Sequence, residues 1–282
     1  TEKIVAGGAA NVSNNGATLG GRIFAAGLVG DDNAAKGLSG ILQEKSVDVS
    51  GFIKDANRST ISKTRIVAGG RTTVSQQIVR VDKESKEPMG KAQEQQLEEY
   101  LKQVLPQVKG VVLSDYGSGT ITDKLLGQIF AYCQEHNIPT IVDSRYDILR
   151  FKTVDYIKQN DAELSAAIGR DLATEEELVQ GGCELLLKMS AKGALITRGE
   201  DGMSLFQIIS PQEAADYLKS QEVSGSGEAG QFREGLTVKL VVKRQTGRLS
   251  VVQELISYQD RDILVSHIPV TDKSEVYDVS GA

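Results

Sequence analysis

The first residues with an evident capacity for binding stand near the start of the chain, where Gly7 and Gly8 precede Asn11. Glycine lets a ligand approach the backbone closely, and a helix beginning here offers N–H groups that its own turns do not use. Asn11 supplies the donor and the acceptor that a sugar hydroxyl needs. These residues predict a small polar ligand site, with a simple helix start as the alternative. They do not form a P-loop, because no Gly-Lys-Ser/Thr follows.

Two later groups are suited to a metal ion and to phosphates. Asn160 and Glu163 stand about one helical turn apart, so they can share a face and hold a hydrated magnesium ion through water. A helix N-cap explains the same pair equally simply. Thr197, Gly199 and Gly202 frame a turn between two strand-like runs, which offers a hydroxyl, backbone N–H groups and the guanidinium of Arg198 to phosphates. A plain hairpin turn is the alternative there.

The final residues, from Asp278 to Ala282, combine an N-cap residue with Gly281. A helix that begins there would direct N–H groups toward a transferring phosphoryl group. A frayed chain end is the alternative.

Composition and charge narrow the range of partners. The chain has 282 residues, 40% hydrophobic and 25% charged, as expected for a globular protein with one large core or two modest ones. A net charge of -6 leaves no basic stripe for nucleic acid and no polybasic segment for a membrane. The longest apolar runs, such as Val111–Leu113, cannot span a bilayer, so we expect a cytoplasmic location. Cys133 and Cys183 lack metal-ligand spacing and are expected to be reduced thiols.

Hydrophobic periodicity alternates between strands and helices. Strands are predicted near residues 23–28, 110–114, 140–143, 194–197 and 203–206, and helices near 33–45, 91–104, 122–136 and 175–189. This order predicts an α/β fold, a parallel sheet flanked by helices on both faces. Such sheets bind ligands at the carboxyl ends of their strands, where Ser114–Gly117, Asp143–Arg145 and Thr197–Gly199 stand.

One segment breaks this alternation. Ser59–Ala68 and Thr73–Asp82 have β-branched and polar residues in turn and no helix between them, so residues 59–82 predict an antiparallel hairpin. A small sheet of this kind can be a lid that excludes water from a site. A simple edge hairpin is the alternative.

Taken in order, these motifs resemble the PfkB family of carbohydrate kinases, which has the ribokinase fold. The first family signature is matched by Gly7, Gly8, Ala9, Asn11, Ser13, Gly20 and Gly30, and the second as far as Ala282. Five further stretches look most like the bacterial heptose-7-phosphate kinase branch: Val29–Asp32, Ser46–Val49, Thr60–Arg65, Val79–Asp82 and Val112–Gly119. The resemblance covers residues 1 to about 206 and 261–282, so we expect residues 1–282 to be one incomplete kinase domain.

The resemblance implies ATP-dependent phosphorylation of a sugar or sugar phosphate hydroxyl, with ATP and Mg²⁺ as cofactors. Each candidate residue then has a role: Gly7, Gly8 and Asn11 at the sugar hydroxyls, Asn160 and Glu163 at magnesium, Thr197, Gly199 and Gly202 at the nucleotide phosphates, and Gly281 and Ala282 in the anion hole. An exposed lid sheet also favours a homodimer formed through it.

The chain departs from the family at several points. The family's catalytic base is an aspartate expected just beyond Ala282, so no catalytic residue is assigned and little activity is expected of this chain by itself. A non-catalytic relative that binds sugar and nucleotide is the alternative. Ser118 stands where the heptose kinase branch has lysine.

Residues 207–260 form an atypical insert where the family has a short connection. Within it, Pro211–Ser220 predicts a helix and Ser224–Gly230 a flexible stretch. Thr237–Lys243 and Leu249–Leu255 predict a hairpin.

Overall fold

The structure is a computed structural model that describes residues 3–69, 76–224, 227–229, 232–233, 235–246 and 249–270. The chain divides into two compact units. Among the described residues, the first unit comprises 3–109 and 114–137, and the second comprises 110–113 and 138–270.

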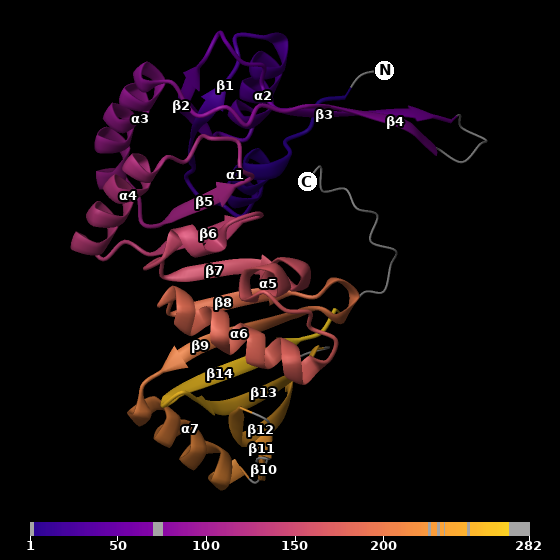
Figure 1. Ribbon diagram of the computed structural model, residues 1–282, viewed down its shortest axis with the longest axis vertical. Helices are drawn as coiled ribbons and strands as arrows, with labels where there is room; N and C mark the ends of the chain where they lie inside the picture. Colours follow the sequence, from indigo (N-terminus) through magenta and orange to yellow (C-terminus); the bar gives the residue numbers. More distant parts are fainter. Residues whose placement is uncertain are drawn as a thin grey trace. The chain divides into compact units, whose positions relative to one another are not determined.

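The first unit contains two small sheets and four α-helices among its described residues (Figure 1). In chain order its elements are α1 (Gly8–Thr18), β1 (Phe24–Val29), α2 (Asn33–Gln43), β2 (Asp48–Lys54), β3 (Ser62–Ala68), β4 (Gln76–Lys83), α3 (Lys91–Val104), the 3-10 turn η1 (Leu105–Gln107) and α4 (Asp123–Glu135). β1 and β2 pair in parallel, and β3 and β4 form an antiparallel ribbon.

Caps and apolar stripes explain why the helices of the first unit form where they do. α2 begins after Asp32, whose side chain accepts a hydrogen bond from the N–H of Ala35. α3 buries Leu97, Leu101 and Val104, a spacing of four and three residues that puts one stripe against the rest of the unit. The core below α1 and α2 is small, and its buried members are Ala25, Leu42 and Val47.

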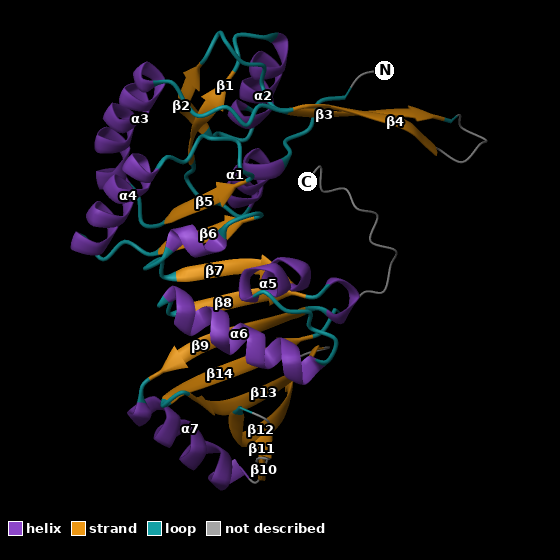
Figure 2. Ribbon diagram, in the orientation of Figure 1, coloured by secondary structure: helices purple, strands orange, loops and turns teal. Residues whose placement is uncertain are grey.

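The second unit is built around a mixed sheet (Figure 2). Its elements are β5 (Val111–Asp115, whose last two residues belong to the first unit), β6 (Thr140–Ser144), η2 (Ile148–Phe151), β7 (Tyr156–Asn160), α5 (Asp161–Ile168), α6 (Glu175–Met189), β8 (Gly193–Thr197), η3 (Gly199–Asp201), β9 (Met203–Ile209), α7 (Pro211–Ser224), β10 (Gly227–Ala229), β11 (Phe232–Arg233), β12 (Leu236–Thr246), β13 (Leu249–Tyr258) and β14 (Arg261–Ile268). The strand order is β10-β12-β13-β14-β9-β8-β7-β6-β5, and β11 pairs with β12.

Alternation along the strands explains how α6 covers the sheet. Val142, Ile157, Ala194 and Phe206 are partners across successive strands, and all four are buried. α6 contacts β8 and β9 on this face, and a Cβ on its Gly182 would lie only 2.3 Å from the ring of Phe206. Helix and sheet therefore approach as closely as a glycine allows.

Most predicted elements are confirmed. The helices expected at 91–104 and 175–189 have these bounds, and the hairpin expected within 59–82 is the β3–β4 ribbon, although residues 70–75 lie outside the described residues. The parallel arrangement is confirmed for β6, β7 and β8. Beyond β8 the sheet is antiparallel, because β9 pairs antiparallel with β8 and with β14, and β12 to β14 pair antiparallel in turn.

Residues 207–260, the segment expected to be an insert, contain a helix and several strands. The helix expected at Pro211–Ser220 is present as α7, and the hairpin expected from Thr237 to Leu255 is β12 with β13. The flexible stretch expected at Ser224–Gly230 is wrong for Gly227–Ala229, which pair with β12 as β10. Three remaining residues of that stretch, 225, 226 and 230, lie outside the described residues.

Cys133 and Cys183 are both buried and free, as expected of reduced thiols. Burial raises the pKa of the Cys183 thiol to about 12, so the group stays neutral at ordinary pH. Over the described part of the chain, no helix is both long and apolar enough to cross a membrane.

The close approach of α6 to β9 predicts that Gly182→Ala lowers the free energy of unfolding by about 1–3 kcal/mol, because the added methyl group overpacks against Phe206. Urea unfolding measures the change. Gly127→Ala is the matched control, since Gly127 is helical, exposed and has no atom within 4 Å of its Cβ position. That variant is expected to gain about 0.5–1 kcal/mol from helix propensity, so equal effects at the two positions would contradict the packing argument.

Candidate functional site

The first candidate group lies at the start of α1. Gly7 is the N-cap of this helix, and no side chain caps its N-terminal end. Gly8 has φ +50°, and its missing Cβ would lie 3.4 Å from the ring of Tyr116. Asn11 follows within the first turns and is half-buried. The predicted helix start is therefore confirmed, and sugar binding stays a prediction.

Tyr116 belongs to the loop that follows β5, one of the three polar segments expected at strand ends. Two glycines, Gly117 at φ +68° and Gly119 at φ +72°, adopt the left-handed backbone that shapes this loop. The N–H of Gly117 donates to Asp115 Oδ1 at 3.0 Å, and the hydroxyls of Ser118 and Thr120 are 3.0 Å apart. The structure thus brings the loop after β5 against the Gly8 turn, a contact that the sequence did not indicate.

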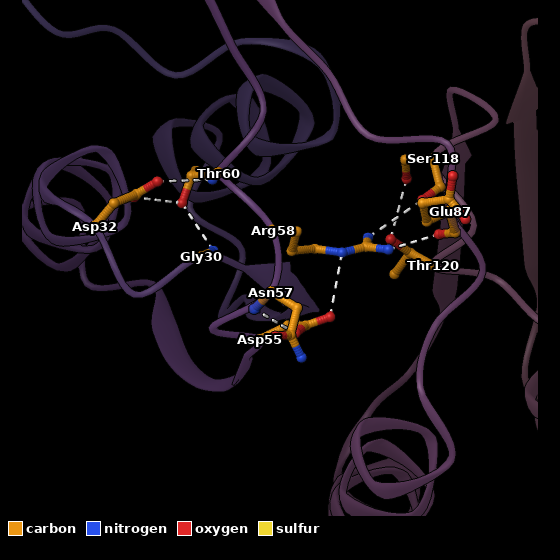
Figure 3. Close-up of polar contacts among 9 residues, drawn as sticks. All are labelled: Gly30, Asp32, Asp55, Asn57, Arg58, Thr60, Glu87, Ser118 and Thr120. Atoms are coloured by element: carbon orange, nitrogen blue, oxygen red, sulfur yellow. Dashed lines mark hydrogen bonds and ion pairs between the residues drawn. The ribbon is translucent and has the colours of Figure 1, made fainter.

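Arg58 joins this loop to two other segments of the first unit (Figure 3). Its side chain is only 6% exposed and donates from Nη2 to the carbonyl of Glu87 at 2.6 Å and from Nη1 to the carbonyl of Ser118 at 3.4 Å. The Nε atom lies 3.4 Å from Asp55 Oδ2, an ion pair without hydrogen-bond geometry. Arginine suits this place because its planar fork can address several acceptors from one fixed position.

A second joint lies beside Arg58, where the chain enters β3 (Figure 3). Thr60 donates from its N–H to Asp32 Oδ2 at 2.8 Å and from its hydroxyl to Asp32 Oδ1 at 2.7 Å. The N–H of Gly30 donates to the Thr60 hydroxyl at 2.9 Å. A Cβ on Gly30 would lie 2.6 Å from the carbonyl oxygen of Arg58. The Val29–Asp32 motif therefore holds the start of the hairpin in place through the hydrogen bonds of Gly30 and Asp32 with Thr60.

The second candidate group lies at the carboxyl ends of β7 and β8. Asn160 is the N-cap of α5, and its Oδ1 accepts from the N–H of Glu163 at 2.7 Å. Glu163 Oε2 accepts in return from the N–H of Asn160 at 2.8 Å, which completes a capping box. The N-cap interpretation is confirmed, while magnesium binding stays a prediction. The oxygen atoms of this pair suit Mg²⁺ held through water, since the box uses one of the two Glu163 oxygens.

The turn after β8 lies directly beside this pair. Thr197 is the register partner of Asn160 in the parallel pairing of β7 with β8. Arg198 donates from its N–H to the carbonyl of Gly202 at 2.8 Å, which closes the turn. Gly199 and Gly202 have φ values of +54° and +87°. The hairpin-turn interpretation is thereby confirmed as geometry, and phosphate binding stays a prediction.

Two other predicted segments have different outcomes. Asp143, at the end of β6, forms an ion pair at 3.2 Å with Lys158 on β7, so it belongs to the same edge of the sheet. Gly281 and Ala282, expected in the anion hole, lie outside the described residues.

Comparison with protein families matches residues 1–223 to the description "pfkB family carbohydrate kinase". The chain belongs to the pfkB family of carbohydrate kinases. The glycine start of α1 and the turn after β8 both lie within the matched residues.

Among curated relatives, the "Bifunctional protein HldE" of Geobacter metallireducens is 36% identical over 206 residues, which are 73% of this chain and 41% of that protein. The protein of the same name from Hyphomonas neptunium is 37% identical over 231 residues, 80% of this chain and 46% of its own length. The chain thus spans less than half the length of these two relatives.

Solved structures share the fold. Phosphofructokinase-2 from Escherichia coli, in complex with substrates and products, has a TM-score of 0.54 at 20% identity and covers 76% of this chain and 74% of its own. Arabidopsis thaliana ribokinase, complexed with ribose and ATP, has a TM-score of 0.51 at 21% identity and covers 70% of this chain and 62% of its own. The ribokinase-like α/β fold expected from the sequence is confirmed.

The joint at Asp32 predicts a pH-dependent contribution to stability. Hydrogen bonds from Ala35 and Thr60 hold the pKa of Asp32 below its usual 3.8. Its carboxylate therefore stabilises the fold above about pH 4, and this contribution is lost as the pH falls through the lowered pKa. Asp32→Asn is expected to lose about 1–3 kcal/mol at pH 7, and its gap from the wild type should narrow toward pH 3.

Urea unfolding at several pH values measures this gap. Asp31→Asn is the control, because Asp31 is 61% exposed and pairs only at the surface with Lys54. Its expected effect is within about 0.5 kcal/mol at every pH. A gap for Asp32→Asn that stays constant from pH 7 to pH 3 would contradict the assignment.

Proposed function

We propose that the full-length protein is an ATP-dependent kinase that phosphorylates a hydroxyl of a sugar or sugar phosphate. The observation that carries the proposal is the register of β7 with β8, which sets the Asn160–Glu163 box beside the Thr197–Gly202 turn. Oxygen ligands and a glycine turn are thereby neighbours at the strand ends where α/β sheets bind ligands.

The donor nucleotide would bind to the second unit. The turn from Gly199 to Gly202 has backbone N–H groups for the phosphates, and Thr197 adds a hydroxyl whose present contact, to the carbonyl of Gln159, is long at 3.5 Å. Asn160 and Glu163 would hold Mg²⁺ through its water molecules. Magnesium, when bound, would neutralise the charge that develops on the phosphates.

The acceptor sugar would bind to the first unit. Gly7 and Gly8 leave the backbone at the start of α1 open, and Asn11 can donate to one hydroxyl while it accepts from another. Tyr116 supplies an aromatic wall beside Gly8. The Arg58 joint would fix the loop that carries this wall, and the β3–β4 ribbon would act as the lid that excludes water.

A heptose phosphate is the proposed acceptor. The support is the set of stretches that resemble the heptose-7-phosphate kinase branch, of which Thr60–Arg65 forms the base of the ribbon. Ser118 replaces the lysine of that branch, so the phosphate of the acceptor would need another cation.

The proposed protein partner is a second copy of the chain. The proposed location of the protein is the cytoplasm. On one face of the β3–β4 ribbon, Ile66 pairs across the strands with Val79, and Val81 lies two residues along the same strand. These three side chains are 44–50% exposed. Pairing of two ribbons would cover them, and sedimentation of Val79→Lys against the wild type tests this.

The sugar site predicts that Asn11→Ala weakens sugar binding by about 1–3 kcal/mol, because hydroxyl partners would be lost. Calorimetry on the full-length protein measures the affinity. Asn15→Ala, at an exposed position one turn later on α1, is the control and should leave sugar affinity unchanged. Unchanged affinity in Asn11→Ala would remove this residue from the site.

The metal site predicts that Glu163→Gln raises the magnesium requirement and lowers turnover while the fold stays intact. Glutamine can still accept the N–H of Asn160 and so keeps the capping box, whereas the charge near magnesium is gone. Glu177→Gln is the matched control, since Glu177 occupies the same position in the capping box of α6. Equal magnesium titrations for both variants and the wild type would leave Glu163 with only its capping role.

Activity itself is tested by ATP turnover of the full-length protein with a panel of sugars and sugar phosphates, heptose 7-phosphate included. Turnover that depends on one of them supports the kinase. Binding of sugar and nucleotide without turnover would favour the alternative, a non-catalytic relative. Binding of neither would reject both.

A further inference from the structure

A cluster of polar side chains on β9, β13 and β14 lies on the α6-covered face of the second unit's sheet. Ser204 on β9 and His267 on β14 are register partners, and Ser204 Oγ lies 2.9 Å from His267 Nδ1. Glu254, on β13, lies with its Oε2 3.7 Å from His267 Nε2. Ser204 is fully buried, Glu254 is 5% exposed and the His267 side chain is 11% exposed. Burying three polar groups costs free energy unless they satisfy one another.

The cluster extends from the buried face to the Thr197–Gly202 turn. Glu175, the first residue of α6, lies with its Oε1 3.7 Å from His267 Nδ1. The same Oε1 lies 3.4 Å from Nη1 of Arg198, whose side chain is only 14% exposed. Arg198 closes the turn by its backbone bond to Gly202. A chain of neighbours therefore runs from Glu254 through His267 and Glu175 to Arg198.

A second contact joins β14 to the same turn. A Cβ on Gly202 would lie 2.1 Å from the carbonyl oxygen of Ile268, the residue after His267, and 2.9 Å from Cα of Pro269. The turn therefore rests directly on the end of β14. Any shift of His267 along this strand end would be transmitted to Gly202 by packing and to Arg198 through Glu175.

We infer that His267 is a positioning residue for the Thr197–Gly202 turn and that, through Glu254 on β13, the insert of residues 207–260 takes part in nucleotide binding. The inference rests on the proposed nucleotide role of this turn. Glu175 is 55% exposed, so packing alone does not hold its side chain, and His267 restricts where its carboxylate can lie. A restricted Glu175 orients the Arg198 guanidinium before phosphate arrives, and such preorganisation favours binding.

The first test measures the NMR signals of the His267 imidazole. The chain has two histidines, so nitrogen NMR of the imidazoles gives two sets of signals, and His136→Gln assigns them. Glu254→Gln and Glu175→Gln are each expected to shift the His267 signals and to leave those of His136 in place. Glu176→Gln, an exposed neighbour in the first turn of α6, is the matched control for helix-end charge. Unshifted His267 signals in both Glu254→Gln and Glu175→Gln would overturn the inference.

The second test measures amide hydrogen exchange in the turn and, separately, the affinity for a nucleotide. His267→Leu is expected to speed amide hydrogen exchange of residues 198–203 by about tenfold or more, because the turn opens locally without its support. His267→Asn can keep the hydrogen bond to Ser204 and should restore slow exchange. If His267→Leu does not fold, Glu175→Gln gives the same reading from an exposed position, again against Glu176→Gln.

Affinity of the full-length protein for a non-hydrolysable ATP analogue with Mg²⁺ is then measured by calorimetry. His267→Leu and Glu175→Gln should weaken it about tenfold, because the turn and Arg198 are then less preorganised for the phosphates. Unchanged exchange in both variants overturns the positioning role, whatever the nucleotide result. Faster exchange with no nucleotide binding by the wild type would instead overturn the proposed function, and with it the role of the insert in nucleotide binding.

Discussion

The parallel pairing of β7 with β8 is the constraint on which the second unit depends. Its register sets Ile157 opposite Ala194 on the covered face and Asn160 opposite Thr197 at the strand ends. A slip of one residue would turn the buried side chains to the other face, so the apolar packing below α6 also determines which polar residues meet at the edge. The burial of apolar residues on one face and the meeting of Asn160 with Thr197 at the strand ends thus follow from a single pairing.

Hydrogen bonds from side chains connect the loops of the first unit, because loops do not satisfy their backbone groups within a helix or a sheet. Arg58 and Thr60 each bind to groups that no helix or strand would satisfy: the carbonyls of Glu87 and Ser118, and the carboxylate of Asp32. These bonds fix the geometry of the segments that they join, although the buried Arg58 Nε has an ion pair with Asp55 and no hydrogen bond. The ribbon of β3 and β4 consequently depends on a few directed bonds at its base more than on buried apolar area.

The sequence predicted elements best where a cap and an apolar stripe coincide. α6 has both, since Thr174 and Glu177 form its capping box and Leu178, Cys183 and Leu186 are buried along it, and its bounds agree with the prediction. β7 was not predicted because its run of Tyr, Ile, Lys, Gln and Asn is mostly polar, and only the pairing with β8 makes it a strand.

The residues of the candidate site also fall into two groups, those that the sequence indicated and those that it did not. Gly7, Asn160 and Thr197 stand in local motifs and were found from the sequence. Arg58 and His267 were missed, because their partners come from distant segments: Arg58 bonds to Glu87 and Ser118, and His267 contacts Glu175 and Glu254. A signal existed for Gly30 in the Val29–Asp32 motif, but only the approach of Arg58 explains why glycine is needed there.

The position of residues 210–260 between β9 and β14 also affects how the second unit forms. β9 pairs with β14, and between them the chain runs through α7 and β10 to β13, so paired residues such as Ile209 and Asp262 are about fifty residues apart. Contacts between distant residues form slowly, because a long loop must close before they stabilise anything. As the chain leaves the ribosome, the edge of β9 that pairs with β14 therefore stays unpaired until residues 210–260 and then β14 have been synthesised. An unpaired edge is where a chain joins wrong partners, so this interval is when the newly made protein is most open to misassembly.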